Sequence, residues 1–302
     1  MSSEPTAVSS PADHRRGILL VAGSALVWST GGLIVRSIET ADSWTTILWR
    51  SFSAAAFLLL FMLVRDGARG TVGLFRRMGV AGVFVGACFA CASISLVVAL
   101  SLTTVADVLI IMSAAPLLAA LLGRIVLGEA VRPQSWAAIA ATIVGIGLMV
   151  SDAWGRGSVQ GDLIALLIAA AYAAAIVTTR RHSTIRMTPA VCTGTVIAGL
   201  IALPLATPLA VSAGEVPLLL LFGAGQLGLG LALFASGARL VPAAEVALLG
   251  TLETILGPVW VWLALGEQPA PRALVGGAIV LTALLLHTAM DFRRRAPKVP
   301  IA

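Results

Sequence analysis

Ten long apolar stretches alternate with short polar segments along this chain, and every second segment is rich in arginine. An apolar stretch of about 20 residues, folded as an α-helix, crosses a hydrocarbon layer of about 30 Å. The runs are unbroken, whereas the strands of a membrane barrel alternate over about ten residues. The pattern predicts an all-α integral membrane protein with ten transmembrane helices, over 17–36, 44–64, 79–100, 104–124, 133–151, 161–181, 189–211, 216–238, 242–264 and 270–290.

The amino-acid composition agrees with membrane helices and argues against a soluble fold. AVILMFWYC residues make up 59% of the 302 positions, charged residues make up 11%, and the mean hydropathy is +1.00. A soluble domain of this size cannot hide so much apolar surface from water. We therefore expect the lipid bilayer as a partner, short loops, and no separate soluble domain.

The cations gather in every second loop. If the N-terminus is cytoplasmic, the cytoplasmic segments hold Arg15, Arg16, Arg65, Arg69, Arg76, Arg77, Arg124, Arg132, Arg180, Arg181, Arg186, Arg239, Arg293, Arg294, Arg295 and Lys298. The opposite loops hold only Arg36, Arg156 and Arg272. This asymmetry predicts a multi-pass protein of the inner (plasma) membrane with both termini in the cytoplasm. The net charge of +6 then marks one membrane face and does not indicate a nucleic-acid partner.

The second half of the sequence repeats the first. Gly17, Leu19, Trp28 and Arg36 recur in order as Gly161, Leu163, Tyr172 and Arg180, and Ala106-Asp107-Val108 recurs as Ala244-Glu245-Val246. Each half holds five spans, an odd number, so the halves are predicted to be inverted. Inverted repeats are typical of secondary transporters that work by alternating access. We expect a cytoplasmic tail over 1–16, five-helix repeats over 17–151 and 161–290, a linker over 152–160, and a basic cytoplasmic tail over 291–302.

Several motifs resemble a known family. Trp28 in the first span, Arg50 in the second, and the recurring Leu127-Gly128-Glu129 and Leu265-Gly266-Glu267 are similar to the EamA family of the drug/metabolite transporter superfamily. The resemblance covers 17–290 and implies an exporter, with bacterial aromatic and neutral amino-acid exporters as the nearest branch. One departure is that the family often has Glu-Pro midway along the ninth span, where this chain has Glu253-Thr254.

Charged side chains inside the spans are the first candidates for transport. Glu253 lies about 16 Å into its span, near mid-membrane. It contacts a substrate ammonium, carries a coupling proton, or serves only as a buried structural carboxyl. Arg50 and Asp107 lie at similar depths from the outer side. The favoured interpretation is an ion pair between them, and the alternative is that Arg50 binds a substrate carboxylate.

Three residues are candidates for gating or coupling. Asp107 and its repeat-mate Glu245 are predicted near opposite mouths of the protein. A gate role suits that placement, although acids at helix N-termini are stabilised by the helix dipole in any case. His287 lies near the cytoplasmic end of the last span. It is a candidate because histidine is the side chain best suited to exchange protons under physiological conditions, and simple packing explains it equally well.

Aromatic and amide side chains are the remaining candidates. Trp28 and Tyr172 lie midway along equivalent spans, where they either face a substrate or pack between helices. Gln226 is the only deeply placed glutamine and a candidate hydrogen-bond partner of the substrate. Its surrounding G-x-G-x-x-G is a false dinucleotide motif, because no strand precedes it. The outer interfacial belt is expected to hold Trp44, Trp154, Trp260 and Trp262, and the inner belt Trp136.

The residues favour a transporter over other membrane proteins. The sequence has no G-x-S-x-G and no H-E-x-x-H motif. Cys88 and Cys91 form a C-x-x-C without a second pair, so we predict no metal and no cofactor. We expect a secondary transporter that exports aromatic or other neutral amino acids or related metabolites. The alternatives are an exporter of drugs or cationic metabolites and, less favoured, a membrane enzyme. A monomer suffices, and proton coupling stays open.

Overall fold

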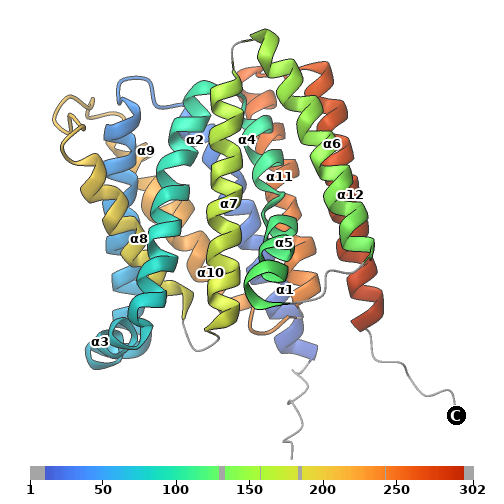
Figure 1. Cartoon of the computed structure of the whole chain (residues 1–302). Helices are drawn as coiled ribbons and strands as arrows, with labels where there is room; N and C mark the ends of the chain where they lie inside the picture. The colour runs from blue at the N-terminus through green and yellow to red at the C-terminus, as the bar shows by residue number, and fades with distance from the viewer. Residues whose placement is uncertain (1–10, 129–132, 157, 183–185, 242, 296–302) are drawn as a thin grey trace, which may run out of the picture.

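The computed structural model describes residues 11–128, 133–156, 158–182, 186–241 and 243–295. Within these residues every regular element is a helix, which confirms the all-α prediction for this part of the chain (Figure 1). The helices are α1 (Pro11–Ser29), α2 (Gly31–Arg36), α3 (Ser43–Leu102), α4 (Val105–Met112), α5 (Ala115–Leu127), α6 (Pro133–Arg156), α7 (Val159–Arg181), α8 (Met187–Ala202), α9 (Val216–Leu220), η1 (Leu221–Leu229), α10 (Gly230–Gly237), α11 (Ala243–Leu265) and α12 (Pro271–Arg295).

Eight helical segments of the described chain are long and apolar enough to cross a membrane, and a shorter apolar helix covers Thr188–Ala202. The chain is therefore a multi-pass membrane protein. The 60 residues of α3 would measure about 90 Å as one straight helix, about three times the hydrocarbon thickness. Its backbone turns at Gly67 (φ 70°) and Gly79 (φ 55°), in the left-handed region that glycine adopts without steric cost. The turns separate two long segments from a short one over 68–78.

The helices run between two ends of the bundle (Figure 1). α1 begins and α12 ends at the same end, which we call the base, and the opposite end is the top. α3 starts at the top, reaches the base at its two glycine turns, and returns to the top. The loop before α9 also lies at the top.

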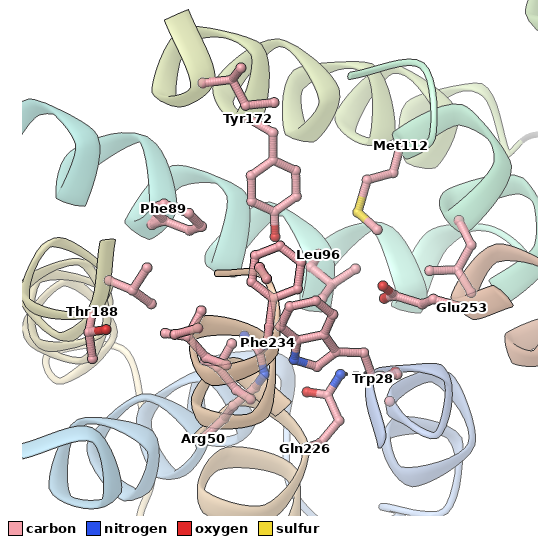
Figure 2. Close-up of a pocket in the computed structure, with 18 of the residues that line it drawn as sticks. Trp28, Arg50, Phe89, Leu96, Met112, Tyr172, Thr188, Gln226, Phe234 and Glu253 are labelled. Atoms are coloured by element: carbon pink, nitrogen blue, oxygen red, sulfur yellow. Dashed lines mark hydrogen bonds between the residues drawn. The ribbon is translucent and has the colours of Figure 1, made fainter. Parts of the chain in front are cut away.

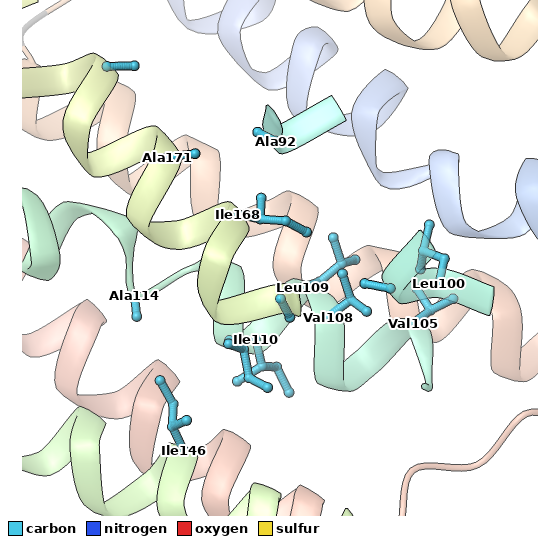
Figure 3. Close-up of a cluster of buried hydrophobic side chains, with 14 of the residues drawn as sticks. Ala92, Leu100, Val105, Val108, Leu109, Ile110, Ala114, Ile146, Ile168 and Ala171 are labelled. Carbon is cyan, nitrogen blue, oxygen red and sulfur yellow. The ribbon is translucent and has the colours of Figure 1, made fainter. Parts of the chain in front are cut away.

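The largest buried cluster lies where α4 packs against α3 and α7 (Figure 3). Val108 and Ile111 of α4 and Ile168 of α7 are all 0% exposed. Because lipid tails are as apolar as these side chains, helix association in a bilayer depends on close packing and small residues. Gly86 of α3 and Gly194 of α8 provide such a contact: a Cβ added to Gly194 would lie 2.5 Å from the Gly86 carbonyl oxygen.

Several helices are interrupted near the middle of the bundle. α1 and α2 break at Thr30, and α4 and α5 break at Ser113 and Ala114. Between α9 and α10 the chain forms a π-helix, η1. π-Helices are rare in proteins, and those that occur are often found at functional sites. Gly223 allows η1 to approach α3, since a Cβ there would lie 2.3 Å from the Arg50 carbonyl oxygen. The glycine-rich run thus serves helix packing within a membrane helix.

One predicted belt tryptophan contacts a neighbouring helix. Trp260 of α11 donates its Nε1 hydrogen to the Ser29 hydroxyl over 2.9 Å, so it ties α11 to the end of α1. The side chain is partly exposed, so its assignment to the outer belt stays a prediction. Trp262 (52% exposed) and Trp136 (43% exposed) do reach the surface. The side chain of Trp154 lies outside the described residues.

Candidate functional site

A cavity of about 730 Å³ lies in the middle of the bundle (Figure 2). Its wall is formed by residues of α1, α2, α3, α4, α7, α8, η1, α10 and α11. Its volume falls within the range of small-molecule sites, about 300–1,000 Å³. The wall is mainly apolar and aromatic, and its middle part carries the few polar side chains Arg50, Tyr172, Thr188, Gln226 and Glu253.

Arg50 of α3 supplies the buried cation of the cavity. Its side chain is 3% exposed, and its Nη1 donates a short hydrogen bond to the Ser93 hydroxyl. The guanidinium also lies 4.6 Å from the ring centre of Phe222 in η1, a cation–π contact between two helices. The predicted ion pair between Arg50 and Asp107 is wrong. Arg50 points into the centre of the bundle, whereas Asp107 belongs to the first turn of α4 near the top.

Glu253 of α11 directs its carboxylate into the cavity (Figure 2). It is the eleventh residue of a 23-residue helix, so it lies near mid-helix as its depth in the sequence predicted. Among the described residues no side chain or backbone group forms a hydrogen bond or ion pair with this carboxylate. A carboxylate placed this way in an apolar surrounding is open to a ligand.

Two aromatic pairs form much of the cavity wall. Trp28 lies 5.4 Å from Phe234 between ring centres, and Phe89 lies 5.6 Å from Tyr172 in an edge-on arrangement. The structure thus brings the repeat-mates Trp28 and Tyr172 to one cavity, and the Tyr172 hydroxyl points toward its centre (Figure 2). Such faces suit an apolar or aromatic group of a ligand.

Gln226, in the middle of η1, connects that helix to the end of α1. It is 6% exposed, and its Nε2 donates to the Trp28 carbonyl oxygen over 3.0 Å. Gly31 makes room for it, because a Cβ there would lie 2.7 Å from Gln226 Nε2. The π-helix therefore places a fixed amide beside Trp28 at the cavity wall.

At the base the cavity reaches the surface among arginines. Arg65, Arg186 and Arg239 line this part, and the side chain of Arg186 is 50% exposed. Asp66 bridges two of them, at 3.0 Å from Arg65 Nη2 and 3.1 Å from Arg186 Nη1. Arg239 donates from Nε to the Ala235 carbonyl oxygen of its own helix. Three cations facing one carboxylate leave this opening positively charged.

At the top the cavity is closed. The lining residues Leu100 and Val105 are 2% and 1% exposed. Nearer the surface, Arg36 Nε and Glu267 Oε2 form an ion pair at 2.9 Å. Arg36 also donates to the Thr103 carbonyl oxygen, and Glu267 accepts from the Val105 amide, each over 2.8 Å. These contacts join the ends of α2, α3 and α11 to the start of α4.

A second polar network joins two loops at the top. Glu215 accepts the amide hydrogens of Glu39 (2.9 Å) and Thr40 (2.8 Å) and the Thr40 hydroxyl (2.6 Å). These bonds, the Thr40 hydroxyl first, hold the pKa of Glu215 below its usual value. Asp42 caps α3; burial acts to raise its pKa, but hydrogen bonds, foremost from Thr45, keep that pKa below its usual value.

The three gate or coupling candidates lie outside the cavity. Asp107 is 0% exposed and accepts hydrogen bonds from threonine hydroxyls at the start of α4. Glu245 lies 3.3 Å from His14 at the base. His287 shares a 2.8 Å hydrogen bond with Ser135, which links α12 to α6. None of the three is among the described residues that line the cavity.

Sequence reasoning missed several cavity residues, because phenylalanine, methionine and serine are ordinary in an apolar span. The missed lining residues are Phe89, Met112 and Phe234, and the missed residues that contact Arg50 are Ser93 and Phe222. Only Ser93 gave a signal, as a hydroxyl in an apolar stretch. The ion pair of Arg36 with Glu267 was also missed, although both charges lie in loops of the same predicted membrane face.

We searched the described part of the chain for side chains that could bind a metal ion. No group of three or more His, Cys, Asp or Glu side chains that could hold a metal ion occurs there. Cys88 and Cys91 of the C-x-x-C are free thiols on α3, and Cys88 is buried. A buried thiol of this kind packs as a small hydrophobic side chain.

Comparison with known proteins assigns this sequence to a family. The sequence profile of the EamA-like transporter family matches residues 15–151 and again 159–289. The chain belongs to the EamA-like transporter family. Members of this family are membrane transporters and not enzymes, so the central cavity of this EamA-like chain is a candidate substrate site.

A solved structure supports the fold of this family member. The crystal structure of another protein superposes on this chain with a TM-score of 0.65, and the two sequences are 18% identical. The similarity covers 93% of this chain and 99% of that chain. At this identity the likeness extends to the fold alone. No curated protein matches the sequence of this chain.

Proposed function

We propose that this EamA-like chain is a secondary transporter that exports aromatic or other neutral amino acids, or related small metabolites, across the inner membrane. The observation that carries the proposal is the presence of Arg50 and Glu253 on the wall of one mainly apolar cavity. In the described part, Arg50 is hydrogen-bonded to Ser93 and does not form an ion pair with Glu253. A zwitterion carries both opposite charges and can compensate each of them.

An amino acid fits this arrangement in a definite orientation. Its carboxylate accepts from the guanidinium of Arg50, which donates in a planar fork. Its ammonium lies against Glu253, and its side chain packs on Trp28, Phe234 and Tyr172. A charge near the bilayer centre costs about 2.5–3.5 kcal/mol on insertion scales. A substrate that neutralises both charges is therefore favoured over one that neutralises neither.

Alternating access is supported by the unequal ends of the cavity. The cavity reaches the surface at the base, where Arg186 is half exposed, and is closed at the top by the pair of Arg36 with Glu267. Release at the top requires that pair to separate while the base closes. In this proposal the substrate enters from the cytoplasm at the base.

We further propose ten crossings in two inverted repeats, with the base and both termini in the cytoplasm. In support, the two long segments of α3 run in opposite directions from the turns at Gly67 and Gly79. α8 adds a short apolar helix to the eight long segments. The arginines of the cavity opening lie at the base, as the positive-inside rule requires of a cytoplasmic face. One chain builds the whole described cavity, which favours a monomer as the working unit.

A second candidate is export of cationic drugs or metabolites. Glu253 together with Trp28 and Phe234 suits an organic cation, which binds carboxylates and aromatic faces. Arg50 and the arginines of the opening repel such a ligand. The two candidates differ in what they require of Arg50, since an amino acid needs this cation and a cationic drug is better bound without it.

The test uses purified protein in liposomes preloaded with a labelled neutral amino acid, with efflux followed with and without a pH gradient. Arg50→Gln and Glu253→Gln should each lower efflux at least about tenfold, the effect of about 1.4 kcal/mol. Glu39→Gln is the matched control, because the Glu39 side chain is exposed and lies outside the cavity. Its efflux should equal that of the unmodified protein.

Three outcomes of this test are informative. An efflux rate that is the same with and without the pH gradient indicates facilitated diffusion. An efflux rate that the gradient increases indicates proton coupling. Efflux of an organic cation that Arg50→Gln increases would favour the second candidate. Absence of protein-dependent efflux for every amino acid would refute the substrate assignment.

A further inference from the structure

The turns at Gly67 and Gly79 isolate a short helical segment, residues 68–78, at the base of α3 (Figure 1). In the sequence these residues formed a basic loop between two spans. Because the segment is helical, its side chains divide between two opposite faces.

One face packs on the protein. Met78 is 8% exposed, and Leu74 and Phe75 pack against a buried cluster that contains Val191 of α8 and Leu231 of α10. Val191 and Leu231 also line the central cavity. The segment therefore supports the cavity wall from the base.

The opposite face is exposed and combines arginine with small apolar side chains. Arg69, Val72 and Arg76 are exposed and, with Ala68 and Gly73, line a shallow depression of about 430 Å³. Val72 is 52% exposed between the two arginines. Residues three and four positions apart share one side of a helix, so the two guanidinium groups flank the apolar floor of the depression.

The arginines of this face lack acidic partners. Among the described residues no carboxylate lies within ion-pair distance of Arg69, Arg76 or Arg77, whereas the neighbouring Arg65 is bound to Asp66. Intramolecular ion pairing therefore does not explain the charges of this segment.

The flanking residues fix the level of the segment relative to lipid. Val64 before it is 81% exposed and Val80 after it is 86% exposed. In a membrane protein such apolar side chains face hydrocarbon, because water disfavours them. The arginines between them lie just beyond that boundary, at the level of the lipid headgroups.

We propose that the exposed face of residues 68–78 binds the phosphate of an anionic phospholipid of the leaflet at the base. Arg69 and Arg76 hold the phosphate between them, and Val72 and Ala68 contact the lipid next to it. Guanidinium groups bind phosphate in a bidentate manner. Each arginine near an anionic surface contributes about fivefold in affinity. A bound lipid then stabilises the base of α3 beside the cavity opening.

The test is independent of transport. The full chain in a neutral detergent is titrated with short-chain phosphatidylglycerol or phosphatidylcholine of equal chain length, and the midpoint of thermal unfolding is followed. Phosphatidylglycerol should raise this midpoint in a saturable way, and phosphatidylcholine should not. Arg69→Gln with Arg76→Gln should raise the half-saturating concentration about 25-fold.

The matched control is Arg124→Gln with Arg181→Gln, which removes the same charge from exposed arginines elsewhere at the base. It should leave the half-saturating concentration nearly unchanged. The proposal is overturned if the half-saturating concentration of phosphatidylglycerol rises equally in both double variants, or if it rises in neither. It is also overturned if the two lipids act alike, or if inorganic phosphate alone reproduces the stabilisation. None of these results depends on which substrate the protein carries.

Discussion

At the top of the bundle Arg36 pairs with Glu267, and Glu215 is bound by the loop before α3, whereas at the base Arg186 and Arg239 border an open passage. The top closes because opposite charges and hydrogen-bond partners meet there. The base carries an excess of one charge, so its arginines repel one another and cannot seal it unaided. Closure of the top thus coincides with matched charges, and the opening at the base coincides with cations that outnumber their one carboxylate partner.

The largest effect is expected at the ion pair of the top. Glu267→Lys places a cation beside Arg36 and removes a charge-assisted bond that contributes about 1.5–3 kcal/mol, so the top should open. A cysteine at Leu100, in a chain whose own cysteines are replaced, reports this opening. Its labelling by an impermeant maleimide from the top side should rise at least about tenfold.

The charge-swapped variant, Arg36→Glu with Glu267→Lys, is the control for this prediction. It retains an ion pair of reversed polarity and should restore low labelling of the cysteine at position 100. Equal labelling of the unmodified protein and Glu267→Lys would show that this pair does not close the top.

A smaller effect is expected at the buried hydroxyl beneath that pair. The Thr103 hydroxyl donates to Asp162 over 2.8 Å and lies 3.3 Å from Asp107, and both acids are 0% exposed. Thr103→Val keeps the side-chain volume and removes the donor, which should cost about 1–3 kcal/mol of unfolding free energy. Thermal unfolding in detergent measures it. Thr103→Ser keeps the hydroxyl and should behave like the unmodified protein, and a fully stable valine variant contradicts the prediction.

A pH-dependent and still smaller effect is expected for Glu215. Because its hydrogen bonds lower its pKa, its stabilising contribution is complete above the ordinary glutamate value and is lost as pH falls through the lowered value. Glu215→Gln should therefore unfold at lower temperature than the unmodified protein at pH 7. The two unfolding midpoints should converge near pH 4 and below. A difference that persists unchanged in acid would exclude the carboxylate as its cause.

The smallest effect is expected at the base. Asp66→Asn breaks the bridges to Arg65 and Arg186, but Arg186 is half exposed, so the change should cost only about 0.2–1 kcal/mol. High salt should remove the difference in thermal unfolding, because exposed ion pairs are screened. If Asp66→Asn destabilises the protein as much as Thr103→Val does, the contrast between the two ends is wrong.

The helical segments could be predicted from the sequence, but most of the contacts between side chains of different helices could not. A run of apolar residues long enough to span a bilayer must form a helix, since every backbone group needs a partner inside lipid. The predicted pair of Arg50 with Asp107 failed because depth in the membrane does not fix which helix a side chain faces.

From the apolar runs and charges alone, we could predict that the chain crosses a membrane repeatedly, that its cations favour one face, and that its halves correspond. These properties depend on local apolar length and on the order of charges along the chain. The folded structure was needed to show that Arg50, Glu253, Trp28 and Tyr172 share one cavity, and that Arg36 meets Glu267. Helices that are apolar on nearly every side carry little information about which side faces a neighbour, so packing makes that choice.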